Sequence, residues 1–194
     1  MELQKIAVKI FASPNDIPLT AFINVFHGWI QATDGVYHDV ADYSHMQAGP
    51  GIVLVASHAN VSIDETNNRR GLLYRQKAHL CGSNEEKIRA ILRAALKCCR
   101  RLEEEPVLRG KLKFSNEEIF IAINDRLLAP NRQGTLTALK QDLEGAIRPL
   151  VGAAKFTLEH NQDPRENISV TVRASKHFEM DELAGAAGAE TQSC

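Results

Sequence analysis

Pro18-Leu-Thr-Ala-Phe22 and Thr135-Leu-Thr-Ala-Leu139 share one pattern, and they decide the fold that we expect for this chain. An offset of 117 positions, from 18 to 135, superimposes the two stretches and also pairs Phe26 with Leu143. Apolar residues that recur every three or four positions predict a helix with one buried face in both places. We therefore expect the same kind of helix in each half of the chain.

Each of these helices stands between strands. Ile6, Val8 and Ile10 alternate with other residues and predict a strand before the first helix, and Ile119-Phe-Ile-Ala-Ile123 predicts a strand before the second. Two strands are expected after each helix, and an offset of 116 positions aligns them at residues 38–44, 51–57, 155–160 and 168–174. A βαββ order of elements therefore occurs twice.

The chain between the two units predicts a hairpin and one long helix. Residues 60–64 and 71–77 read as strands on either side of a polar turn. Ser83, with Glu86 three residues later, forms a capping box, and the apolar stripe that follows predicts a helix to about residue 104.

These elements predict an α+β fold of duplicated βαββ units with an inserted hairpin and one long helix, packed about a pseudo-twofold axis. The units are expected at about residues 4–58 and 117–175, with the insertion at 59–116. We expect a single domain over 1–182, because each unit alone buries too little apolar surface. The Gly-, Ala- and Glu-rich segment 183–194 is expected to be a disordered tail.

Composition restricts the possible partners. The 23 Lys and Arg residues nearly balance the 24 Asp and Glu residues, so the net charge of −1 gives no strong signal for nucleic acid binding. The longest apolar run, residues 51–56, is far shorter than the roughly 20 residues that cross a membrane. No secretory layout opens the sequence, and the four cysteines lack metal-finger spacing. We expect a cytoplasmic protein without a membrane partner.

The repeat predicts a site where its two copies differ. At the offset of 116 positions, Asp42 replaces Leu158 and His58 replaces Ala174 on a strand face that is otherwise apolar. A buried, unpaired carboxylate costs several kcal/mol. These two side chains are therefore expected to pair with each other, to bind a ligand or to line a cleft, and they are our candidates for catalytic residues.

Asp39 and His45 extend this pair to an Asp/His cluster and are candidates for ligand binding. Imidazole and carboxylate groups hold divalent metals such as Zn²⁺, Mn²⁺ or Fe²⁺, so Asp42, His45 and His58 are candidate metal ligands. The same residue types could instead supply an acid–base pair without a metal. The structural alternative is a hydrogen-bonded Asp–His pair at a sheet end, or residues that simply face solvent.

A basic stretch, residues 69–77, provides a second candidate site. Tyr74 and Arg75 lie within it and are candidate ligand-binding residues, because cationic side chains on one strand could meet an anion or an acidic partner. The alternative is a solvated strand edge whose charges discourage aggregation.

Several runs resemble a family of conserved bacterial proteins of unassigned function. They are Asp39-Val-Ala-Asp-Tyr-Ser-His45, Gly49-Pro-Gly51 with His58, Arg70-Gly-Leu-Leu-Tyr74, and Asn124-Asp-Arg-Leu-Leu-Ala-Pro130. The resemblance covers nearly the whole chain up to about Ala174. It implies no activity, substrate or cofactor.

Two hypotheses about function follow from the sequence. The first is an intracellular protein, either an enzyme or a binding protein, that uses the Asp/His cluster to bind a small ligand or a divalent metal. The second is a non-catalytic interaction or homo-oligomerisation protein that uses the long helix, residues 83–104, or an edge strand as an interface. The first hypothesis predicts that the four cluster side chains converge.

Overall fold

The computed structural model describes residues 1–175 of the 194-residue chain. The fold class is α+β, as expected. The expected tail, 183–194, lies outside the described residues. The elements in chain order are β1 (Ile6–Ala12), α1 (Ala21–Ala32), β2 (Tyr37–Tyr43), β3 (Gly51–Ala56), β4 (Ala59–Asp64), the short 3-10 helix η1 (Thr66–Asn68), β5 (Gly71–Gln76), α2 (Asn84–Glu104), β6 (Phe114–Ile123), α3 (Gln133–Val151), β7 (Phe156–His160) and β8 (Ser169–Ala174).

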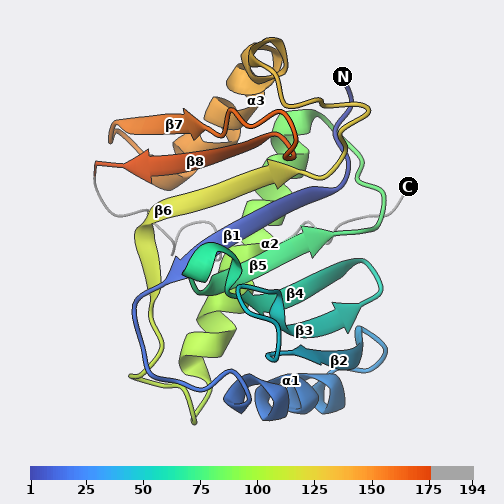
Figure 1. Cartoon of the computed structure of the whole chain (residues 1–194), viewed down its shortest axis with the longest axis vertical. Helices are drawn as coiled ribbons and strands as arrows, with labels where there is room; N and C mark the ends of the chain where they lie inside the picture. Colours follow the sequence, from blue (N-terminus) through green and yellow to red (C-terminus); the bar gives the residue numbers. More distant parts are fainter. Residues whose placement is uncertain (176–194) are drawn as a thin grey trace.

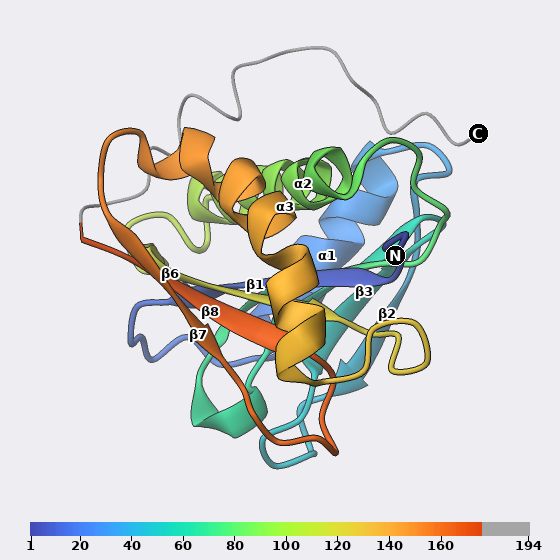
Figure 2. The ribbon, with the colours of Figure 1, turned by 90° about the horizontal axis from the view of Figure 1, so that it is seen from above.

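One antiparallel sheet of eight strands holds the described part of the chain together, in the order β2-β3-β4-β5-β1-β6-β8-β7 (Figure 1). The three α-helices lie on one face of this sheet, and η1 lies on the other (Figure 2). The helix α2 packs over the central strands β1 and β5, and α1 covers the β2 edge. The helix α3 packs beside α2 near the opposite edge, which β7 forms (Figure 1).

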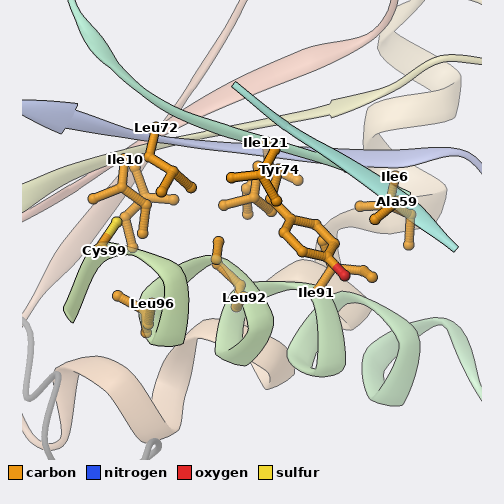
Figure 3. Close-up of a cluster of buried hydrophobic side chains, with 14 of the residues drawn as sticks. Ile6, Ile10, Ala59, Leu72, Tyr74, Ile91, Leu92, Leu96, Cys99 and Ile121 are labelled. Atoms are coloured by element: carbon orange, nitrogen blue, oxygen red, sulfur yellow. The ribbon is translucent and has the colours of Figure 1, made fainter. Parts of the chain in front are cut away.

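The core lies between the helices and the sheet. In β1, Ile6, Val8 and Ile10 are fully buried on the helix side. Each such side chain contributes roughly 1.5–3 kcal/mol when it leaves water. Figure 3 shows the residues of α2 that face this layer, Ile91, Leu92, Leu96 and Cys99. The alternation in β1 predicts one buried face, but Ala7 and Lys9 on the opposite face are buried as well.

The long helix begins where its capping box predicts. The Ser83 side chain accepts a hydrogen bond from the Glu86 backbone, and the Glu86 carboxylate accepts one from the Ser83 backbone N–H at 2.8 Å. Both bonds satisfy backbone N–H groups that have no carbonyl acceptor within the helix, because they lie at its amino-terminal end. The apolar stripe predicted for this helix is buried along its full length, at Ile88, Ile91, Leu92, Ala95, Cys99 and Leu102.

The order of strands is the same in the two halves of the fold. In the second half, β8 lies between β6 and β7; in the first half, β3 lies between β1 and β2 once the β4–β5 hairpin is set aside. The first strands of the two halves, β1 and β6, pair at the centre, with Val8 opposite Ile121. This arrangement is compatible with the expected pseudo-twofold axis, and the repeat in the sequence stays a prediction.

The offset of 116 positions is wrong for the register of the paired strands. Asp42 pairs with Ile52, so the offset predicts that Leu158 pairs with Ile168. The structure instead pairs Leu158 with Val172. Side chains alternate between faces with a period of two, so any even offset preserves the face of a residue without fixing its partner.

Proline normally ends a helix, so the sequence predicts that the last helix stops at Pro149, and this prediction is wrong. The helix α3 includes Pro149 and ends at Val151, before Gly152 with φ +54°. Proline has no N–H to donate to the carbonyl four residues earlier, which here belongs to Gly145. Arg89 of α2 donates to that carbonyl at 3.3 Å, so a side chain replaces the missing helical hydrogen bond.

A buried ion pair lies on the sheet face that the α-helices leave open. Lys9 of β1 and Asp64 of β4 are 5% and 3% exposed, and the Lys9 Nζ is 2.5 Å from the Asp64 carboxylate. The same carboxylate accepts hydrogen bonds from the backbone N–H and the hydroxyl of Thr66, at 3.1 and 2.9 Å. Burial lowers the pKa of Lys9, and the contact with Asp64 opposes that change.

Within residues 1–175, no helix is long and apolar enough to cross a membrane. The cytoplasmic location stays a prediction.

Candidate functional site

Asp42 and His58 lie at opposite ends of the same strand pair. Asp42 pairs with Ile52 near the start of β3, and His58 follows the end of β3 at Ala56. Ile52 and Ala56 are four residues apart in β3, which corresponds to about 13 Å along a strand, and His58 lies beyond Ala56. The prediction that Asp42 and His58 converge is therefore wrong, and they form no acid–base pair.

Asp42 does share a sheet face with Ile52, but the edge strand β2 leaves it exposed to solvent. Its carboxylate keeps contact with water, so the cost of burial on which the prediction relied does not arise. The Asp42 side chain accepts a hydrogen bond from the Ser44 backbone N–H at 2.8 Å. Hydrogen bonds from Ser44 lower the pKa of Asp42.

His58 stands in the turn between β3 and β4 and is half-buried. Its backbone carbonyl accepts hydrogen bonds from the N–H groups of Lys77 and Ala78, at 2.8 and 3.0 Å. Burial, followed by the charge of Lys77, lowers the pKa of His58. The neutral imidazole is therefore favoured in the folded protein.

Asp39 and His45 do not join these residues. Asp39 accepts a hydrogen bond from the backbone N–H of Val40 at 2.8 Å, and the His45 ring lies 6.5 Å from the Tyr43 ring. No three His, Cys, Asp or Glu side chains in the described residues lie close enough to hold a metal ion together. The expected divalent metal site of Asp42, His45 and His58 is not formed.

Tyr74 and Arg75 point to opposite faces of β5, as neighbours on a strand must. Tyr74 is 6% exposed and lies against α2 beside Ile91 (Figure 3), and burial raises its pKa. Arg75 is exposed on the open face. The two residues therefore cannot bind one ligand together.

The first two cations of the basic stretch hold the fold together. Arg69 donates two hydrogen bonds to the Glu118 carboxylate, at 2.9 and 2.8 Å, and stacks over the Phe11 ring. Arg70 pairs with Glu65 at 2.7 Å and donates to the Asn15 side chain at 2.8 Å. This finding favours the structural interpretation of Arg69 and Arg70.

A groove of about 530 Å³ lies between α3 and the edge strand β7. A second cavity below α3 measures about 10 Å³, too small for any ligand. The groove is lined by Lys140, Glu144 and Arg148 of α3, by Ala153, Ala154 and Lys155 of the connection, and by Phe156, Thr157 and Leu158 of β7.

Arg148 contacts two other residues of this lining. Its guanidinium lies 4.9 Å from the centroid of the Phe156 ring, and one of its N–H groups donates to the Ala154 carbonyl at 3.5 Å. Lys140 is 3.9 Å from Glu144, one turn along the same helix. The lining therefore holds three cations and one anion around half-buried apolar surface from Phe156 and Leu158.

The sequence contains a pattern that belongs to this groove, but the prediction from the sequence favoured the Asp/His cluster instead. Lys140, Glu144 and Arg148 follow one another at intervals of four residues, which places them on one helix face. Lys155 and Phe156 begin the next predicted strand. Sequence alone did not reveal that the helix and the strand leave a space between them.

The long helix offers little surface to a partner. Of its residues 84–104, only Glu86, Lys97 and Glu104 are exposed. An interface based on this helix, one of the two interfaces that we expected, therefore has little support from the structure. The other interface that we expected, an edge strand, is still possible at β7.

Comparisons with protein-family models, with curated proteins and with solved structures find no match for this chain. The resemblance to a bacterial family stays a prediction. The groove must therefore be judged on its own chemistry.

Proposed function

We propose that this chain is a ligand-binding protein whose groove between α3 and β7 takes a ligand with a negative charge next to an apolar group. The proposal rests on one observation: the guanidinium of Arg148, which lines the groove, lies over the Phe156 ring and uses few of its hydrogen-bond donors among the described residues. It retains ligand binding, as the sequence suggested, and moves it away from the Asp/His cluster.

The local charge supports an anionic ligand. The whole chain has a formal net charge of −1, whereas the groove is lined by Lys140, Arg148 and Lys155 against the single acid Glu144. The groove is therefore more positive than the protein as a whole. An anion that enters it loses some water, and its attraction to these cations becomes stronger than in bulk solvent.

Arg148 is suited to bind such an anion. A guanidinium has five N–H donors, and within residues 1–175 only one of those of Arg148 has a protein acceptor, the distant Ala154 carbonyl. The stacking over Phe156 restricts the side chain before a ligand arrives, so less conformational entropy is lost on binding. The exposed part of the Phe156 ring and the Leu158 side chain would contact the apolar part of the ligand.

The proposal concerns binding and does not include a reaction. The nine lining residues supply one carboxylate, and no imidazole or thiol is among them. Acid–base and nucleophilic catalysis by these groups would need a partner that could accept or donate a proton near neutral pH.

A fluorescence titration with anilinonaphthalene sulfonate tests the proposal, because this probe combines an anion with an aromatic body. We expect Arg148→Gln to weaken binding about fivefold, the factor that corresponds to roughly 1 kcal/mol for one exposed, charge-assisted contact. Arg126→Gln is the matched control, since Arg126 is also exposed and also donates one 3.5 Å bond to a backbone carbonyl. It should leave the affinity unchanged.

Two further measurements separate charge from apolar contact. Glu144→Gln removes the acid of the groove, so it should strengthen binding of the sulfonate. Phenylnaphthylamine has a similar aromatic body without the charge, and its binding should not respond to Arg148→Gln. Equal effects of Arg148→Gln and Arg126→Gln on the sulfonate would refute the groove as the binding site.

A further inference from the structure

We infer that the ligand of this groove is an acidic peptide segment of a partner protein, bound in an extended conformation as a strand added to β7. The inference rests on the proposed function and deepens it by naming the class of ligand. It depends on the outer edge of β7, which runs beside the groove and pairs with no strand in the part of the chain that the structure describes.

The hydrogen bonds at the ends of β7 show which of its backbone groups are free. Ser175 donates to the Lys155 carbonyl at 2.9 Å, and Asn161 donates to the Ser169 carbonyl at 3.1 Å. In an antiparallel pair, residues alternate between those bonded to the neighbouring strand and those directed away from it. Lys155, Thr157, Glu159 and Asn161 therefore bond to β8, and the groups of the residues between them point outward.

The outward residues are Phe156, Leu158 and His160. No hydrogen bond found within residues 1–175 uses their backbone N–H or carbonyl groups. A sheet edge of this kind is a template for another strand, and main-chain hydrogen bonds then provide affinity without regard to the bound sequence.

The groove supplies the sequence preference that the edge alone lacks. Phe156 and Leu158 direct their side chains to the helix side of the sheet, because they pair there with Ala174 and Val172. Alternate side chains of an added strand would project to the same side, into the groove with Arg148 and Lys140. Among the side chains that enter the groove, which are those at every second position of the added strand, a mixture of acidic and apolar residues fits this lining.

The other edge of the sheet does not suit this ligand. Strand β2 has a register shift between Tyr37 and Asp39, and irregularities of this kind obstruct strand addition. It also exposes Asp39 and Asp42, which would repel an acidic peptide. The chemistry therefore favours β7.

A second copy of this chain fits the β7 edge less well than an acidic peptide does. Pairing of β7 with β7 would bring together two grooves that each contain Lys140, Arg148 and Lys155. The acid of β7 itself, Glu159, already pairs with Arg173 at 3.2 Å. Like charges opposite each other disfavour such a dimer.

The test uses the peptide acetyl-Thr-Glu-Thr-Leu-Thr-Glu-Thr-amide with the full-length protein, and amide hydrogen exchange measured by NMR. We expect slower exchange at Phe156, Leu158 and His160 when the peptide binds, and at least tenfold weaker binding of a peptide with Gln in place of Glu. Arg148→Gln should weaken peptide binding as well, and Arg126→Gln should not.

Backbone methylation of the peptide distinguishes strand addition from simple charge attraction. In an added strand, alternate peptide N–H groups face β7, so methylation of one alternate set should abolish binding and methylation of the other set should not. Equal tolerance of both sets would overturn strand addition.

The outcomes separate this inference from the proposed function. Binding of anilinonaphthalene sulfonate that depends on Arg148, without binding of the peptide, would overturn the inference and leave the proposed function standing. If neither the sulfonate nor the peptide binds at the groove, both the proposed function and this inference are refuted. Protection of Phe156, Leu158 and His160 that grows with protein concentration in the absence of peptide would mean that a second copy occupies the edge, and would also overturn the inference.

Discussion

Replacement of Lys9 with methionine should destabilise the protein by about 3 kcal/mol, because it leaves the buried Asp64 carboxylate without a counter-charge. The Lys9 and Asp64 side chains are 6% and 4% exposed, so water offers little compensation. Removal of one partner from a buried ion pair typically costs 3–5 kcal/mol. We expect the lower end of this range, since the two hydrogen bonds from Thr66 to Asp64 remain.

The measurement is urea denaturation of the wild type, Lys9→Met, Asp64→Asn and the double variant. The double variant should lose less stability than the sum of the single losses, by at least about 2 kcal/mol, because neither side chain then carries an uncompensated charge. A loss below about 1 kcal/mol for Lys9→Met would refute the reasoning, since that is the range of an exposed pair. Additive losses would show that the two residues do not interact.

Three smaller predictions concern single residues. His58 should titrate below 6.5 in NMR, because burial and Lys77 lower its pKa, and Lys77→Gln should raise the value slightly. Since the unfolded chain then binds more protons between the folded pKa of His58 and 6.5, thermal stability should fall as pH decreases through that window. Gly145→Ala should come within about 0.5 kcal/mol of Gly134→Ala in chemical denaturation, because the Glu85 carboxylate that lies 2.3 Å from the new Cβ is the end of a flexible, partly exposed side chain and can move away, whereas nothing lies near the Cβ at Gly134. A loss of more than about 1 kcal/mol relative to Gly134→Ala would mean that the Glu85 side chain is held in place between α2 and α3. Ser83→Ala should cost about 1 kcal/mol, as the loss of a helix cap does, and no change would mean that the capping box is not formed in solution.

The elements of the fold followed from local patterns in the sequence. The capping box at Ser83 marked the start of α2, and the alternation of Ile6, Val8 and Ile10 marked the face of β1 that packs against the helices. Such signals depend on residues close together in the chain. They are reliable because backbone geometry determines which neighbours share a face.

The register and the site depended on contacts between distant residues. The even offset placed Asp42 on the correct face of β2 but could not show that His58 lies at the other end of β3. Proline normally ends a helix because it lacks an N–H, but α3 continues past Pro149. The donor that replaces the missing N–H is Arg89, which belongs to a different helix and could not be recognised from the residues around Pro149. Tertiary contacts of this kind override local signals.

The groove was missed for a related reason. Lys140, Glu144 and Arg148 have the spacing of any solvated helix face, and most such faces bind nothing. Their difference lies in the position of Phe156, which brings an aromatic ring under Arg148. Only the packing of α3 beside β7 makes that contact.

An NMR titration of backbone amides with anilinonaphthalene sulfonate tests the central claim most directly. If the groove between α3 and β7 is the binding site, the largest shifts should fall on residues 140–158, and Arg148→Gln should reduce them. Shifts confined to the open face of the sheet, or to the region of Asp42 and His58, would contradict the claim.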